Sequence, residues 1–205
     1  LEEVGGIAVV SEKAGVFLKN NAENKDELEL YFEALREQFK DLDFPITLQL
    51  GANSHMMSAH YDPVQDTWIF MNANQKARTQ NAVVKTSSSA ELAQRVRAGF
   101  FTQKLPHLIM TTTLCVAKNH EPALKEQVAQ LQQNSNFNKL FEITPQKMQA
   151  RSLENATWLY EAMLASELET VQAMHQAGYV EYDKALDLDF TTIQKKEKAY
   201  AATYF

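Results

Sequence analysis

ITLQLGANSHMMSAHYDPVQDTWIFM, residues 46–71, contains three segments with strand character, and in the first, 46–50, apolar and polar side chains alternate. Alternation with a period of two is typical of a strand that buries one face. The polar loop 62–66, which contains a proline, separates the second and third segments and favours a hairpin. This stretch therefore predicts antiparallel sheet structure. The segments predicted as strands are 46–50, 55–61 and 67–71.

Helical patterns lie on both sides of these strands. Apolar residues in 28–39 recur every three or four positions, which predicts an amphipathic helix with Asn24 as its N-cap. A serine triplet precedes a second predicted helix at 90–102, and the β-branched stretch 108–117 predicts another buried strand. Nearly everything after Asn119 has a helical pattern. We therefore predict an α+β domain over 1–120 and a helical module over 121–205.

The segment 155–180, NATWLYEAMLASELETVQAMHQAGYV, has the layout of two short helices. Thr157 is suited to cap the first, and Gly178 can take the left-handed conformation that ends the second. In its spacing the segment resembles a single ankyrin repeat, with Trp158 in place of the usual proline. The resemblance implies an all-α ankyrin-like repeat module within 121–205. A generic helical hairpin is the alternative interpretation.

Residues 54–75, SHMMSAHYDPVQDTWIFMNANQ, resemble the histidine-to-acid hairpin of papain-like cysteine proteases of the YopT and AvrPphB type. His55 stands at the position of the histidine, and Asn72 stands where that family has its acid. The resemblance implies a papain-like antiparallel sheet with flanking helices, in which Asn72 orients His55 as a general base. Asparagine has this role in Cys-His-Asn sites. His55 and Asn72 are our candidate catalytic residues.

Both residues also have structural interpretations. His55 is equally consistent with an ordinary strand histidine, and Asn72 with a residue that ends a strand through local hydrogen bonds.

The nucleophile of such a site is missing from its expected place. In papain-like enzymes the cysteine precedes the histidine and opens the central helix, yet the single cysteine of this chain, Cys115, follows both candidate residues. Cys115 lies in an apolar stretch, where a thiol packs as a small hydrophobe. Two hypotheses follow: the nucleophile lies upstream of Leu1, or the chain is a pseudoenzyme.

Composition limits the classes of partner and cofactor. A net charge of −6 argues against a surface that neutralises phosphates. A single cysteine excludes a multi-cysteine zinc site, and the histidines lack the spacing of metal ligands. No apolar run has the length of a membrane span. We predict no cofactor, no metal, no nucleic-acid partner and no membrane span.

A papain-like segment followed by an ankyrin-like repeat resembles the architecture of ankyrin-bearing effector proteins that intracellular bacteria such as Legionella inject into host cells. They imply secretion into the host cell cytoplasm and a Cys-His-Asn domain that modifies a host protein selected by the ankyrin-like repeat. Two alternatives stay open. One is a non-catalytic binding protein on a pseudoprotease scaffold, and the other is a different thiol acyl-transfer enzyme, such as a deamidase or transglutaminase.

Overall fold

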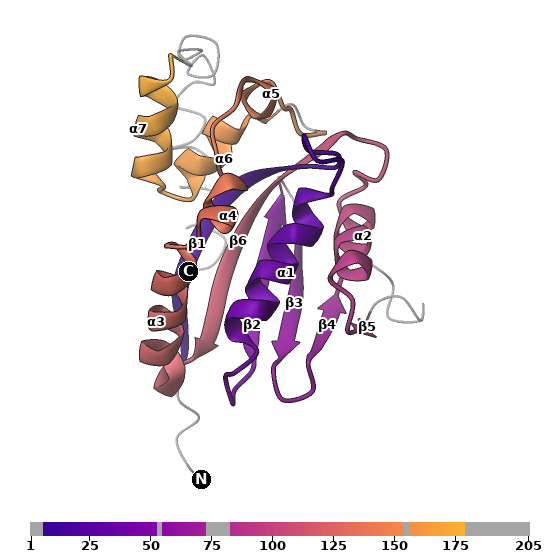
Figure 1. Cartoon of the computed structure of the whole chain (residues 1–205), viewed down its shortest axis with the longest axis vertical. Helices are drawn as coiled ribbons and strands as arrows, with labels where there is room; N and C mark the ends of the chain where they lie inside the picture. The colour runs from indigo at the N-terminus through magenta and orange to yellow at the C-terminus, as the bar shows by residue number, and fades with distance from the viewer. Residues whose placement is uncertain (1–5, 53–54, 73–82, 154–155, 179–205) are drawn as a thin grey trace, which may run out of the picture.

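The computed structural model describes residues 6–52, 55–72, 83–153 and 156–178, which form one six-stranded antiparallel sheet and seven α-helices (Figure 1). The spatial order of the strands is β1-β6-β2-β3-β4-β5. The strands are β1 (Ile7–Leu18), β2 (Ile46–Ala52), β3 (His55–Asp62), β4 (Thr67–Met71), β5 (Val83–Thr86) and β6 (His107–Ala117). The helices are α1 (Glu27–Phe39), α2 (Ser89–Gly99), α3 (Glu121–Leu131), α4 (Ser135–Lys139), α5 (Pro145–Met148), α6 (Trp158–Leu164) and α7 (Leu168–Gln176).

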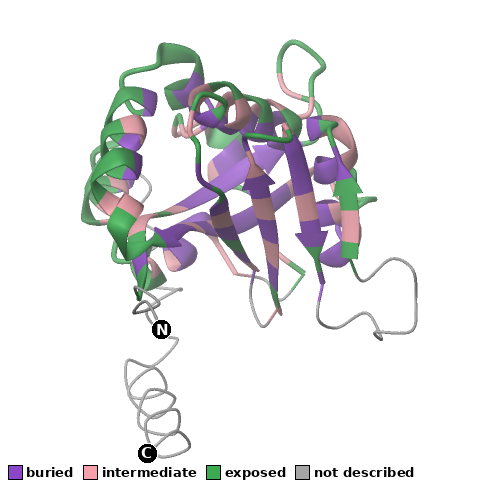
Figure 2. Cartoon of the chain, turned by 90° about the horizontal axis from the view of Figure 1, so that it is seen from below, coloured by how far each residue is buried: buried purple, intermediate pink, exposed green. Residues whose placement is uncertain are grey.

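The three strands predicted within 46–71 are confirmed as β2, β3 and β4. Apart from Thr67, their buried side chains point to one face of the sheet, because consecutive residues of a strand face opposite sides. Helices α1 and α2 lie over this face, which we call the helix face (Figure 1). Figure 2 shows the buried layer between the strands and these helices. The helix-face residues of the three strands include Ile46, Leu48, Leu50, Met57, Ala59, Tyr61, Trp68 and Phe70.

Helix α1 forms because its apolar residues recur at helical spacing and become buried against the sheet. Leu28, Phe32 and Leu35 are fully buried on that side. The N-cap is Asp26, not the predicted Asn24: the Asp26 carboxylate accepts a hydrogen bond of 2.9 Å from the Leu28 amide. Asn24 instead has a positive φ of 59° in the preceding turn, a conformation that asparagine tolerates.

Two buried ion pairs hold the first turn of α1. Arg97 of α2 donates two hydrogen bonds to the Asp26 carboxylate, at 2.7 and 2.8 Å. The buried Lys147 of α5 lies 2.9 Å from the Glu27 carboxylate, which also accepts from the amide of Leu18 at the end of β1. The start of α1 therefore connects β1, α2 and α5.

The predicted fold class is wrong in its second half. The segment predicted as an ankyrin-like repeat does form a helical hairpin, α6 and α7, closed by Gly178 with φ +81°. However, within the described residues its apolar side packs onto β1 and β6. Trp158 and Ala162 share a buried cluster with strand residues, and the Trp158 indole donates to the Ala14 carbonyl. The helices are short and cover the sheet, so the described residues contain no all-α ankyrin-like module.

Residues on both sides of position 120 contribute to the core beneath α1. Leu124 and Val128 of α3 and Phe137 of α4 pack in the same cluster as α1 and the helix face. The predicted division into 1–120 and 121–205 stays a prediction. The part of the predicted helical module that follows Gly178 lies outside the described residues.

We expect Lys147→Met to destabilise the fold by about 3–5 kcal/mol, because it leaves the Glu27 carboxylate buried without its cation. The double variant Glu27→Gln/Lys147→Met should recover much of this loss, since a neutral amide still accepts from the Leu18 amide. Urea unfolding of both variants measures the difference. Equal stability of wild type and Lys147→Met would contradict the conclusion that Lys147 stabilises the buried Glu27 carboxylate.

Candidate functional site

The structure brings His55 and Asn72 to one face of adjacent strands. Ser58 of β3 lies opposite Met71 of β4, so the register continues with Asn72 opposite Met57. His55 lies two residues from Met57 and shares its face. The candidate catalytic residues are therefore diagonal neighbours on the helix face, where long side chains of adjacent strands come within reach. Their catalytic role stays a prediction.

The end of α2 covers this pair. The ring of Phe100 meets the imidazole of His55 edge to face, with centroids 5.6 Å apart. Asn72 is only 4% exposed. Gly99 lies so close that a Cβ there would stand 2.2 Å from the Met57 sulfur and 3.1 Å from the Asn72 amide nitrogen. The two candidate residues thus lie under a helix end, in the margin of the core.

The helix start nearest to this pair carries no thiol. Arg97, two residues before Gly99, pairs with Asp26, so the first turn of α1 lies beside the same end of α2. A papain-like resemblance implies a cysteine at such a helix start. Asp26 and Glu27 occupy it here, and both are engaged in ion pairs.

Cys115 lies on the opposite side of the sheet from His55. It pairs with Thr47 of β2, which in turn pairs with His60, and alternation places His60 and His55 on opposite faces. Cys115 is 4% exposed, so its thiol is buried although it lies on the side of the sheet away from α1 and α2. Burial and the nearby Glu12 carboxylate raise the pKa of the Cys115 thiol, which disfavours the nucleophilic thiolate.

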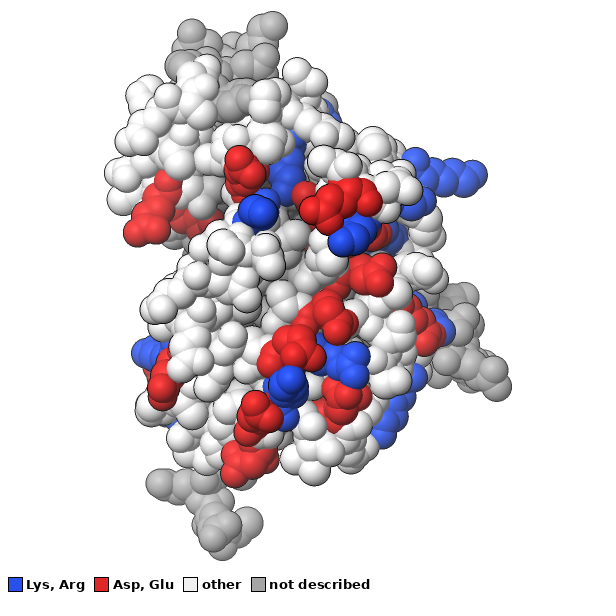
Figure 3. Space-filling model, in the orientation of Figure 1, with Lys and Arg blue, Asp and Glu red and all other residues white. Residues whose placement is uncertain are grey.

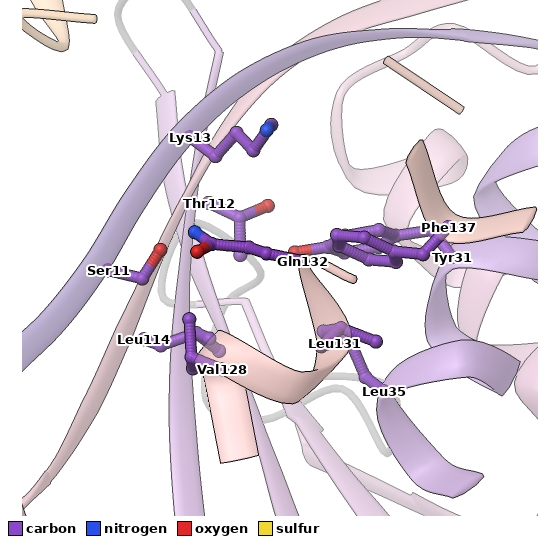
Figure 4. A pocket seen from close by; sticks show the side chains of 10 residues that line it. All are labelled: Ser11, Lys13, Tyr31, Leu35, Thr112, Leu114, Val128, Leu131, Gln132 and Phe137. Carbon is purple, nitrogen blue, oxygen red and sulfur yellow. The ribbon is translucent and has the colours of Figure 1, made fainter. Parts of the chain in front are cut away.

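A small cavity lies between β1, β6, α1, α3 and α4 (Figure 4). Its space of about 20 Å³ suits roughly one water molecule. The ammonium of Lys13 lies 4.4 Å from the centre of the Phe141 ring, and burial lowers the Lys13 pKa against the opposing effect of Glu167 and Glu169. The cavity is too small for an organic ligand. Its lining residues are Ser11, Lys13, Tyr31, Leu35, Thr112, Leu114, Val128, Leu131, Gln132 and Phe137.

The side of the sheet opposite the helix face is a second candidate binding surface. Helices α6 and α7 cover its end on β1 and β6, around Ala14, Val16 and Ile109. We call the remainder the open face. Its residues are Ile7, Val9 and Glu12 of β1; Thr111, Thr113, Cys115 and Ala117 of β6; Thr47, Gln49 and Gly51 of β2; Met56, Ser58 and His60 of β3; Ile69 and Met71 of β4; and Val83 and Lys85 of β5.

The open face exposes large apolar side chains and carries little charge. Five of its residues are among the exposed large hydrophobics: Ile7, Val9, Met56, Met71 and Val83, with Ile7 80% and Met56 61% exposed. Glu12 and Lys85 are the formally charged members of the set. Asp62, at the end of β3, is turned to the hairpin loop, where it accepts from the Gln65 amide.

The helix side of the molecule has the opposite character. Glu29, Glu33 and Glu37 recur along the exposed side of α1. Figure 3 shows acidic side chains gathered across this side, interspersed with basic ones. This is the solvated surface typical of a helix layer, and the contrast marks the open face as the unusual one.

Comparison of the chain with protein-family models, with characterised proteins and with solved structures finds no match. The described residues contain no group of three or more His, Cys, Asp and Glu side chains placed to hold a metal ion. None of their helices is long and apolar enough to cross a membrane, in agreement with the sequence prediction.

We expect the Cys115 thiol of the folded protein to ionise at a higher pH than a free thiol, whose pKa is about 8.5. The rate of alkylation should therefore rise at higher pH in the native protein than in urea-unfolded protein. Glu12→Gln should shift the native profile towards lower pH, because it removes a negative charge that opposes ionisation. An alkylation profile of the native protein centred at the pKa of a free thiol would contradict the conclusion that burial and Glu12 raise the pKa of Cys115.

Proposed function

We propose that this chain is a binding protein that holds another protein on the open face of its sheet. The observation that carries the proposal is the group of five exposed apolar side chains on a face with two formal charges. They form two groups, Ile7 and Val9 on β1 and Met56, Met71 and Val83 on β3 to β5, with polar residues of β6 and β2 between them. Apolar side chains in contact with water are unfavourable, and groups of them mark interaction sites in soluble proteins.

The edges of the sheet are protected, which favours binding through the face. β5 is only four residues long, and β1 has an irregular register between Val9 and Ser11, which interrupts a regular edge. Farther along β1, side chains occupy the outer backbone groups of Ala14: the Glu167 carboxylate accepts from its amide, and Trp158 donates to its carbonyl. These features oppose the addition of a further strand.

Two matched valine variants test the proposal. Val83, on the open face, is 58% exposed, and Val64, in the β3–β4 loop, is 77% exposed. We expect Val83→Glu to abolish capture of the partner by immobilised protein, because it introduces a charge that the interface would bury. Val64→Glu should capture as wild type does. Equal capture by all three proteins would refute the proposal.

Methionine oxidation gives a second measurement on the unaltered chain. Met56 and Met71 of the open face should be protected from oxidation when the partner is bound, because contact excludes the oxidant. The buried Met57 and Met110 should remain unreactive in both states and serve as internal controls.

Thiol acyl transfer is a second candidate function, favoured by the common face of His55 and Asn72. Its nucleophile would be a cysteine outside residues 1–205. A chain that includes this cysteine should lose turnover in His55→Ala and retain a weak rate in Asn72→Ala, because only orientation of the imidazole is lost. Delivery into the host cell cytoplasm also stays a prediction.

Turnover of peptide or glutamine substrates, measured at equal folded fraction, tests this candidate. Unchanged turnover in His55→Ala would remove it.

A further inference from the structure

We propose that the open face binds the open face of a second copy of the same chain, in a two-fold symmetric dimer. This inference rests on the proposed binding function and names its partner. Three features carry it: the position of the two charges, the composition between them and the size of the face.

The two formal charges of the open face lie on opposite edge strands. Glu12 is on β1 and Lys85 is on β5, with the other four strands between them. Lys85 contacts Gln65 of its own chain, and this uncharged amide does not neutralise the ammonium. The face is therefore polarised, with an anion at one side and a cation at the other.

A two-fold axis parallel to the strands reverses the strand order of the second copy. β1 then lies across from β5 of the other chain, and β2 lies across from β3. Glu12 of each copy thereby comes to the side occupied by Lys85 of the other, and the symmetry repeats the pair. The offset between them is about one diagonal step, roughly 7 Å, which long side chains can span.

The residues between these charges suit contact with an identical surface. Thr47, Gln49, Ser58 and Thr113 occupy the central strands. Their uncharged groups can exchange hydrogen bonds with the same groups of a second copy. The exposed methionines and valines lie around them and can bury their side chains against each other, as the inner faces of two stacked sheets do at about 10 Å separation.

The size of the face agrees with a dimer interface. Six strands about 4.8 Å apart span roughly 24 Å, and four rows of outward residues span roughly 20 Å. The flat area is therefore roughly 480 Å², and side chains that stand out of the pleat enlarge it. Interfaces at the lower end of the standard range bury about 600 Å² on each partner.

Charge reversal tests the dimer. We expect the full chain to sediment as a dimer, with its dissociation constant raised about tenfold by Glu12→Lys and by Lys85→Glu. The combined variant Glu12→Lys/Lys85→Glu should return towards the wild-type constant, because the swapped charges attract again. Glu29→Lys, which makes the same change in net charge on the exposed side of α1, should leave the constant unchanged.

Each other outcome overturns the dimer. A monomer at every concentration, or a combined variant no tighter than the single ones, would refute it. Oxidation of Met56 and Met71 then separates the causes. Protection that depends on concentration supports the dimer, whereas protection at every dilution would place another part of the same chain on the face. A third outcome is a monomer in which Met56 and Met71 are oxidised freely and Val83→Glu still abolishes capture of another protein. That outcome would refute the dimer and support the binding function with a different partner.

Discussion

The ion pairs at the first turn of α1 are the constraint on which the rest of the structure depends. Asp26 caps the helix and binds Arg97, while Glu27 binds Lys147 and the end of β1. Four elements from distant parts of the chain thereby meet at one helix start. Isolated buried charges are strongly unfavourable, so each of these groups needs all of its partners in place. The arrangement sets the position of α2, and α2 in turn covers His55 and Asn72.

The two sides of the sheet differ in character. α1 and α2 bury the helix face and present acidic side chains to water, whereas the open face keeps apolar and uncharged polar groups outside. In a molecule with a net charge of −6, a surface with one anion and one cation stands apart from the remainder. The candidate pair His55 and Asn72 therefore lies under a helix, and the open face lies on the other side of the sheet.

Local periodicity explains which parts of the fold could be predicted. The alternation in 46–50 and the proline-containing loop 62–66 sufficed for β2 to β4, and the hairpin places His55 and Asn72 on one face. β1 was missed because Ser11, Glu12 and Lys13 interrupt its apolar pattern and a register shift changes its parity. β1 is buried by β6 and α6, which are distant in the sequence, so a local sequence pattern does not indicate this burial. The ankyrin-like prediction identified a real hairpin but not the surface that its apolar side meets. The cover over His55 depends on Gly99, whose missing Cβ permits the close approach of α2.

The pairing of β1 with β6 has a consequence for how the chain acquires its structure. Leu18 pairs with His107 and Ile7 with Ala117, and the amide of Ala14 bonds to Glu167. Such contacts between sequence-distant residues slow folding, because a long loop must close before they form. During translation β1 emerges before β6 and stays without this strand partner until β6 has left the ribosome. Its apolar residues Val16, Phe17 and Leu18 are meanwhile exposed, so the nascent chain presents a segment on which chaperones act.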